Sequence, residues 1–222
     1  MKNIFQKHIS NLLIVLGLCL LASCNLKLQE PFEFVPEVPI LTTFQDQTAW
    51  DWVQKEKTPD TAKVFTTTKF DYLIEAVKLT GLEAEYSKAG NNRTFILLNN
   101  TAFTGTGKIL QLITGSATGK LATITDANKA RLANLLKYHL IDAYVDQVKA
   151  VPIFGAQYEF KTLGTAPNNI ITVSRNERYS LTLNSSANLP TTKRTFGVLR
   201  HNYIFGNGIG HIVDNYAGIA AF

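Results

Sequence analysis

The segment Thr94-Phe95-Ile96-Leu97-Leu98-Asn99-Asn100-Thr101-Ala102-Phe103 decides the fold, because an apolar run is followed at once by polar residues that end it. The continuous run at 94–98 predicts a buried strand. Asn100 is placed to cap or brace the backbone directly after that strand, since a short amide side chain readily bonds nearby backbone groups. The rest of the chain is interpreted outward from this strand.

Helical spacing dominates the neighbouring segments. Apolar residues at 70–77 recur at i, i+3, i+4 and i+7, and Gly81 is placed to end that helix. Shorter helices are expected at 48–53 and 109–113. A further helix is capped by Thr125 or Asp126 and carries Leu132, Leu135, Leu136 and His139 on one stripe.

Beyond residue 141 the pattern changes to short strands separated by turn residues. Asn207-Gly208 is a turn-forming pair that reverses the chain into the last strand. Helices followed by strands indicate the α+β class. The strands are expected at 144–148, 158–163, 170–173, 179–183, 196–199 and 209–213.

Three separated segments together resemble the fasciclin-like domain. The family's first box, T-V-F-A-P-T-N-x-A-F, is similar to residues 94–103, with Leu98 in place of the usual proline and matches at Asn100, Ala102 and Phe103. A leucine-rich helix that ends in a Tyr-His pair corresponds to residues 132–139. The closing box, N-G-x-I-H-x-I-D, is similar to residues 207–214, where Gly210 departs from a large aliphatic residue and the matches are Asn207, Gly208, His211 and Asp214.

The resemblance implies one fasciclin-like domain, with helices of the N-terminal half packed on a strand-rich, β-sandwich-like C-terminal half. It also implies adhesion or binding, and the family's Tyr-His region, here Tyr138 and His139, has been associated with adhesive contacts. The alternative for His139 is a buried histidine bonded to a backbone carbonyl or a box residue. His211 and Asp214 are expected to form a local pair that closes the fold.

Trp50 and Trp52 are candidate contact residues for a chemical reason. Aromatic rings stack on sugar faces and anchor protein interfaces. Two tryptophans on one short helix equally suit the core, so both alternatives stay open.

The N-terminus resembles the signal of a bacterial lipoprotein. Lys2 and Lys7 precede a short apolar run, and Leu21-Ala22-Ser23-Cys24 is similar to a lipobox. The resemblance implies a signal peptide at 1–23, diacylglycerol and further acyl chains on Cys24 as the only bound group, and the bacterial outer membrane as location, on either face. A lipidated, Pro-containing tether at 24–42 and the domain at 43–222 follow.

Charge and cysteine content narrow the function classes. Loss of residues 1–23 removes two lysines, so the formal charge falls from +5 to +3, and the charges are interspersed, which argues against nucleic acid. Cys19 leaves with the signal and Cys24 carries lipid, which excludes cysteine metal sites and thiol catalysis. The Gly-rich segment 115–121 lacks the spacing of a phosphate-binding loop, so no nucleotide is expected.

No catalytic constellation is found, and the histidines are not spaced as metal ligands, so the chain is expected not to be an enzyme and to bind no metal. Two functions remain. One is an adhesion or binding protein for a protein or polysaccharide partner. The other is an accessory subunit of an outer-membrane nutrient (glycan) uptake complex, in which confinement to one membrane reduces the affinity that is needed.

Overall fold

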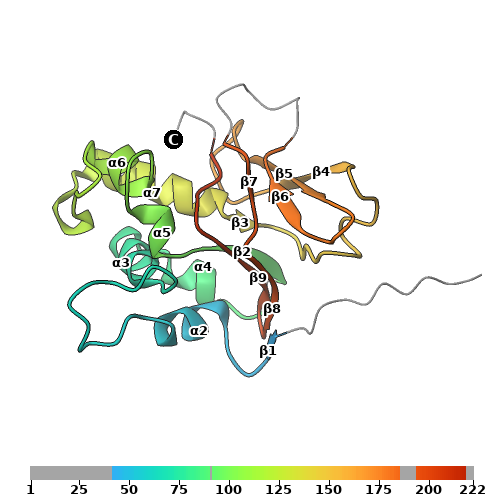
Figure 1. Cartoon of the computed structure of the whole chain (residues 1–222), viewed down its shortest axis with the longest axis horizontal. Helices are drawn as coiled ribbons and strands as arrows, with labels where there is room; N and C mark the ends of the chain where they lie inside the picture. Colours follow the sequence, from blue (N-terminus) through green and yellow to red (C-terminus); the bar gives the residue numbers. More distant parts are fainter. Residues whose placement is uncertain (1–41, 91, 186–193, 219–222) are drawn as a thin grey trace, which may run out of the picture. The chain divides into compact units, whose positions relative to one another are not determined.

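The predicted strand at 94–98 is an inner strand of a five-stranded sheet, and the segment before the last two strands of that sheet forms a second sheet (Figure 1). The computed structural model describes residues 42–90, 92–185 and 194–218. All of these residues belong to one unit, Val38–Phe222. The expected signal peptide, the expected lipidation site Cys24 and nearly all of the expected tether lie outside the described residues.

The five-stranded sheet brings together segments from both ends of the domain. Its order is β1-β8-β9-β2-β3, with β2 parallel to β9 and β1 parallel to β8. The inner strand β2, between β9 and β3, is fully apolar from residue 95 to 98 because both of its faces are covered. The strands are β1 (Thr42–Phe44), β2 (Arg93–Leu98), β3 (Leu140–Ile141), β8 (Arg200–Phe205) and β9 (Gly208–Val213).

The second sheet is antiparallel throughout, in the order β4-β5-β6-β7. Exposed and less exposed residues alternate along β4, which indicates an edge strand with one solvated face. The strands are β4 (Gln157–Lys161), β5 (Ile170–Arg175), β6 (Leu181–Leu183) and β7 (Phe196–Gly197). Expected strands 158–163, 170–173, 179–183 and 196–199 fall here, with shifted ends.

Three of the helix ends lie where the local chemistry predicts. Thr48 and Asp51 form a capping box at the start of α2, Gly81 ends α3 with φ of 67°, and Thr125 caps α7. The helical elements are α2 (Ala49–Lys55), α3 (Asp71–Thr80), α4 (Glu83–Ser87), α5 (Asn100–Phe103), α6 (Ile109–Thr114), the 3₁₀ turn η2 (Leu121–Thr123) and α7 (Asp126–Tyr138). The α+β prediction is confirmed.

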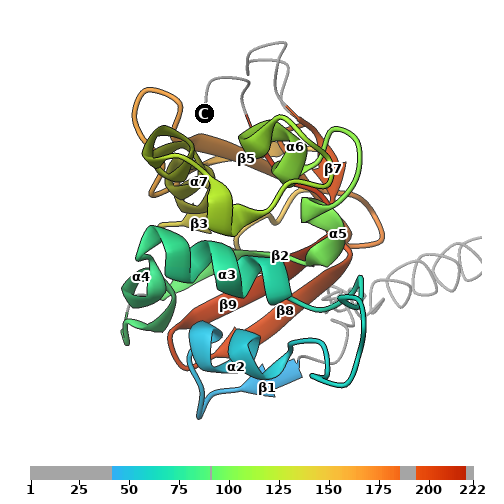
Figure 2. The same ribbon diagram turned by 90° about the vertical axis from the view of Figure 1, so that its left-hand side faces the viewer.

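Helices α2 and α3 cover one face of the five-stranded sheet (Figure 2). On this face Phe205 lies 5.6 Å from Trp52 and 6.4 Å from Phe95, measured between ring centroids. Because side chains alternate along a strand, Ile209, His211 and Val213 point to the opposite face. Among the described residues, no helix combines the length and the apolar character needed to cross a bilayer.

The expected strand at 144–148 is wrong. This segment lies on the face of the five-stranded sheet opposite α2 and α3, where side chains of the sheet bond its backbone. The backbone here bonds to side chains of the sheet instead of to another strand. The Thr94 hydroxyl donates to the Ala143 carbonyl at 2.6 Å and accepts from the Val145 amide at 2.8 Å, while the His211 ring bonds the Val145 carbonyl at 2.8 Å. Side chains therefore satisfy the backbone groups of Ala143 and Val145 that hydrogen bonds to a neighbouring strand would otherwise satisfy.

Candidate binding site

Tyr138 is a core residue. Its side chain is fully buried, and its hydroxyl donates to the Ile170 carbonyl at 2.7 Å and contacts the Asn184 amide oxygen at 3.2 Å. Burial raises the pKa of Tyr138 to about 12. The expectation that Tyr138 contacts a partner is corrected, because the side chain already joins α7 to β5 inside the fold.

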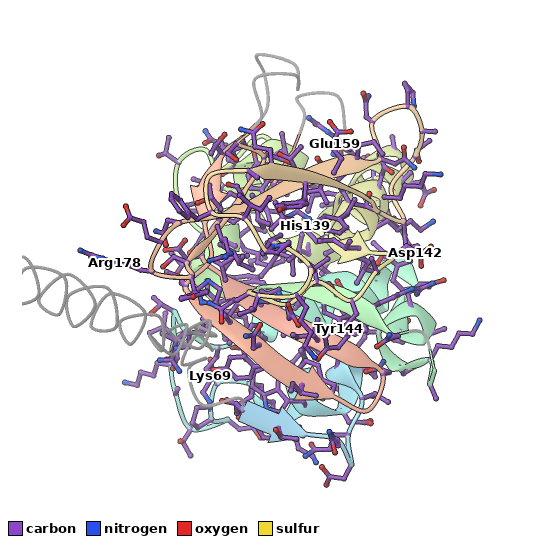
Figure 3. The ribbon with its side chains drawn as sticks, turned by 90° about the vertical axis from the view of Figure 1, so that its right-hand side faces the viewer. Lys69, His139, Asp142, Tyr144, Glu159 and Arg178 are labelled. Carbon is purple, nitrogen blue, oxygen red and sulfur yellow. The ribbon has the colours of Figure 1, made fainter. Side chains whose placement is uncertain are left out.

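His139 caps the C-terminus of α7 and is also fully buried (Figure 3). Its Nδ1 lies 2.8 Å from the Leu135 carbonyl, and its Nε2 accepts from the Ala217 amide at 2.9 Å. These partners require the neutral tautomer with the proton on Nδ1. Burial lowers the pKa of His139 to about 4, so the ring is neutral at pH 7. The buried alternative is correct, and the contact role is not supported.

The two tryptophans are largely buried, at 8% and 6% exposed for Trp50 and Trp52. Trp50 packs 6.2 Å from the ring of Tyr86, within the core. Trp52 packs among Phe70, Tyr203 and Phe205, and part of it lines a surface hollow. Of the four predicted contact residues, only Trp52 lines this hollow.

The first box is structural. Ala102 and Phe103 are fully buried, and Asn100 is 2% exposed. The Asn100 amide oxygen accepts from the Tyr72 amide at 3.1 Å, and its nitrogen donates to the Thr66 carbonyl at 2.8 Å. Asn100 therefore braces the start of α3 and the loop before it. The cap after β2 comes from its neighbour Asn99, whose side chain accepts from the Ala102 amide at 3.3 Å.

The closing box joins the last hairpin to the first helix. The Asn207 amide oxygen accepts from the Ala49 amide at 2.9 Å, and its nitrogen donates to the Tyr86 carbonyl at 2.8 Å. Gly208 has φ of 152°, and an added Cβ would lie 2.1 Å from the Arg93 carbonyl oxygen. Only glycine permits this close approach of two backbones. The two-residue turn itself is Gly206-Asn207, because Phe205 pairs with Gly208.

His211 and Asp214 do not form the expected pair. The His211 ring accepts from the Asn202 amide at 3.3 Å and bonds the Val145 carbonyl, so it holds the 143–147 segment on the sheet. Burial lowers the pKa of His211 to about 4. Asp214 accepts through its backbone carbonyl from the Lys108 ammonium at 2.8 Å. Both residues serve the fold through different partners.

Gly210, the departure from the family pattern, has a local cause. A Cβ there would lie 2.7 Å from the ring of Phe205 and 3.1 Å from Leu97. The ring of Phe205 occupies the space that a large aliphatic residue would fill. The large ring of Phe205, across the hairpin, therefore compensates for the small residue at position 210.

A hollow of about 390 Å³ opens between α2, the start of α3 and strand β8. Three aromatic residues, Trp52, Phe70 and Tyr203, contribute to its wall. Leu199, at 52% exposed, adds an accessible apolar group. The remaining lining residues are Glu56, Thr68, Lys69, Asn99, Arg200 and Ile212. Sequence reasoning missed the hollow because its residues come from five separate segments of the chain.

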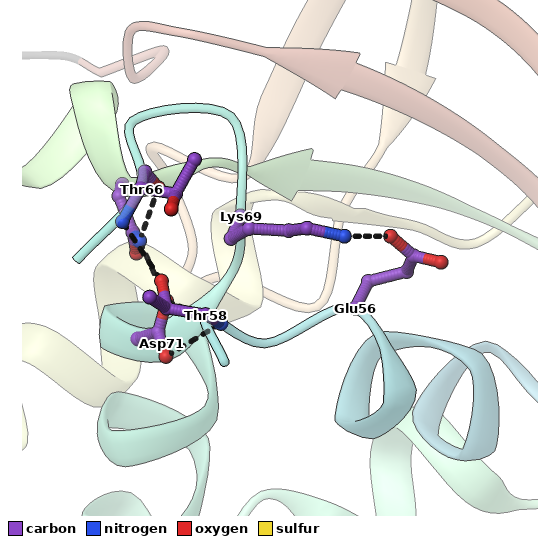
Figure 4. Close-up of polar contacts among 6 residues, drawn as sticks. Glu56, Thr58, Thr66, Lys69 and Asp71 are labelled. Carbon is purple, nitrogen blue, oxygen red and sulfur yellow. Dashed lines mark hydrogen bonds and ion pairs between the residues drawn. The ribbon is translucent and has the colours of Figure 1, made fainter. Parts of the chain in front are cut away.

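A polar cluster fixes the loop that carries Lys69 (Figure 4). Asp71 accepts from the Thr58 amide at 3.0 Å and from the Asn100 amide nitrogen at 2.7 Å. The Thr58 hydroxyl in turn accepts from the Thr66 amide at 2.8 Å. These bonds hold both ends of the 58–66 loop, so the backbone at Lys69 is positioned before any ligand binds.

The charges at the hollow are two cations and one anion. The Lys69 ammonium lies 2.7 Å from the Glu56 carboxylate (Figure 4), and both side chains are about one-third exposed. Arg200 is exposed, and no ion pair with it occurs within the described ranges. Aromatic rings beside a guanidinium and a carboxylate suit a ligand that has both an apolar face and polar groups.

A second hollow lies beside α7 and is lined by small and amide side chains without an aromatic residue; its members are Ala127, Asn128, Ala130, Arg131, Asn134, Thr165, Ala166 and Asn168. Without an aromatic side chain it offers a ligand no ring to stack on, so the first hollow is the better candidate. Over the described part of the chain, no group of three or more His, Cys, Asp or Glu side chains is arranged to hold a metal ion.

Comparison with known proteins confirms the resemblance. A family model described as the Fasciclin domain matches residues 68–217. A similar solved structure is described as a FAS1 domain pair from the insect cell adhesion molecule fasciclin I; it shares 10% identity at a TM-score of 0.50. The match covers 77% of this chain and 50% of that one, so this chain spans half of its length. No curated protein matches the sequence.

Proposed function

Because this chain belongs to the Fasciclin domain family, we propose that it is a non-catalytic protein that mediates adhesion through protein or glycan binding. The described fold supports this role through a rigid platform. The family-motif side chains brace the backbone from within, which leaves recognition to the surface. The structural neighbour is a cell adhesion molecule, which agrees with the proposal.

We also propose that the protein is anchored to the bacterial outer membrane through lipid on Cys24. The support is the sequence alone, in which small residues precede a cysteine after a short apolar run. Two or three acyl chains, at about 0.8 kcal/mol for each buried methylene, anchor a soluble domain stably. A partner in the same membrane then needs only modest affinity.

The contact surface that we propose is the hollow between α2 and β8. The observation that carries this choice is the combination of aromatic wall, exposed Leu199 and the charged side chains of Lys69 and Arg200. Aromatic and arginine side chains contribute most of the binding energy at protein interfaces, and aromatic rings also stack on sugars. Tyr138 and His139 are excluded as contacts because they are buried.

The test is a mild-detergent pull-down of the full-length protein from its native membranes, with the stoichiometry of co-eluting proteins and bound sugar. Arg200→Glu is expected to reduce recovery of the partner at least about tenfold, because it reverses a charge at the hollow. Lys129→Glu makes the same change on the exposed face of α7 and is the matched control. Equal recovery with both variants would contradict the proposed surface.

The same experiment separates the two functions. A transporter at near one-to-one stoichiometry would establish a subunit of an uptake complex. Recovery of the protein without a protein partner, but with bound glycan, would favour an independent adhesin.

A further inference from the structure

One end of the four-stranded sheet carries two neighbouring turns. Strand β4 begins at Gln157, opposite Ser174, so the loop before β4 and the turn after β5 leave the sheet at the same end. Just before the loop, the Gln147 side chain donates to the Tyr179 carbonyl at 2.6 Å and so joins the chain that leads into the loop to the turn. We call this surface, formed by residues 149–156 and 176–180, the turn surface.

The turn surface presents large apolar side chains to water. Ile153 and Phe154 are 64% and 61% exposed, although they are adjacent in sequence. Lys149 in the same loop and Arg178 in the facing turn are exposed, and the Arg178 side chain extends away from the ribbon (Figure 3). Glu177 is the exposed acid of the turn, and the Asp146 carboxylate accepts three backbone amides, of Val148, Lys149 and Ala150.

The loop is held in this exposed form by Arg175. Its guanidinium donates to the carbonyls of Val151 and Pro152, and its own carbonyl accepts from the Gly155 amide at 2.8 Å. The Ile153 amide donates to the Tyr158 hydroxyl at 3.1 Å. The backbone amides on both sides of Phe154 are therefore bonded within the protein. The Phe154 side chain can then enter an apolar environment without exposing these two amides unpaired.

The facing turn is equally constrained. Tyr179 has φ of 61°, a left-handed conformation that bulky residues rarely adopt. The Arg175 guanidinium covers its ring at 4.7 Å from the centroid, and the Asn176 side chain accepts from the Ser180 amide at 3.0 Å. Backbone strain maintained by several contacts is typical of functional surfaces.

We propose that the turn surface rests on a lipid bilayer, with Ile153 and Phe154 in the interfacial region and Lys149 and Arg178 beside anionic headgroups. The Ile153 and Gly155 amides and the Val151 and Pro152 carbonyls are already bonded within the protein, which lowers the cost of placing this loop against lipid. Basic residues next to apolar ones are the usual combination at anionic interfaces. A protein partner would instead require a broad apolar area, whereas this surface offers two adjacent side chains at a loop.

The test uses the full-length protein in vesicles of phosphatidylethanolamine and phosphatidylglycerol with brominated acyl chains. Residues 42–222 contain no cysteine, so Ile153→Cys allows one bimane label there. Val64→Cys is the matched control, because Val64 is 80% exposed and follows Lys63 but lies outside the turn surface. We expect bimane quenching at 153 to exceed that at 64 at least twofold.

A second variant tests the basic residues. Lys149→Glu with Arg178→Glu, in the Ile153→Cys background, is expected to lower quenching to the level at residue 64, because two favourable charges are reversed. Equal quenching at 153 and 64, or no effect of the charge reversal, would overturn the proposal. Vesicle sedimentation reports the lipid anchor separately: failure to sediment argues against the anchor, and quenching at 153 and 64 is compared only in the sedimented, vesicle-bound protein.

Discussion

Replacement of His139 should change how stability depends on pH. His139 is neutral and buried, with a pKa lowered to about 4 from an ordinary 6.5. The unfolded chain therefore binds a proton between these values while the folded chain does not, so stability falls as pH falls below 6.5. The loss is about 1 kcal/mol from pH 7 to pH 5.5 and about 3 kcal/mol by pH 4.

The assay is urea unfolding followed by the fluorescence of Trp50 and Trp52, at pH 7 and pH 5.5. His139→Asn removes the titrating ring, and its amide can still donate to the Leu135 carbonyl in place of Nδ1. It leaves the buried Ala217 amide unpaired, so we expect a loss of about 1–3 kcal/mol at pH 7.

The decisive quantity is the difference in pH slope between parent and variant, since His211 and other groups titrate equally in both. The variant should lose about 1 kcal/mol less than the parent between the two pH values. An unchanged slope would refute the conclusion that His139 is buried and neutral in the folded protein.

Three further substitutions test the braces of the fold by urea unfolding. Asn207→Ala should cost about 2–4 kcal/mol, because it leaves the buried Ala49 amide without its acceptor, and a loss below 1 kcal/mol would contradict this role. Gly210→Ala should cost about 1–3 kcal/mol through overlap with Phe205, whereas a neutral effect would show that the ring moves freely. Thr94→Val, nearly equal in shape, should cost about 1–3 kcal/mol and speed hydrogen exchange at Val145; unchanged exchange would argue against the side-chain bridge.

The sequence predicted the elements whose signals are local. Helix α3 has an apolar stripe and an end at Gly81, and strand β2 is an apolar run, so both were found near their observed bounds. Strand β8 was missed because Arg200, His201 and Asn202 give it no apolar pattern. Its place comes from pairing with β1 and β9, which a local pattern does not contain.

The candidate site was harder to predict for the same reason. Tyr138 and His139 stand out in sequence because they match a family motif, yet the match reflects hydrogen bonds inside the core. The hollow at Trp52 depends on Lys69 and Arg200, which lie 131 positions apart and meet only in the folded chain. A surface formed by residues far apart in the sequence has no local pattern. A motif that braces the backbone is a continuous segment and can be recognised.

The most direct test of the proposed binding surface compares Arg200→Glu with Tyr138→Phe in the membrane pull-down. Tyr138→Phe removes a hydroxyl that bonds Ile170 within the core, so it alters stability without altering the surface. We predict that Arg200→Glu loses the partner and Tyr138→Phe retains it. Loss with Tyr138→Phe in a folded protein, together with retention by Arg200→Glu, would contradict the account.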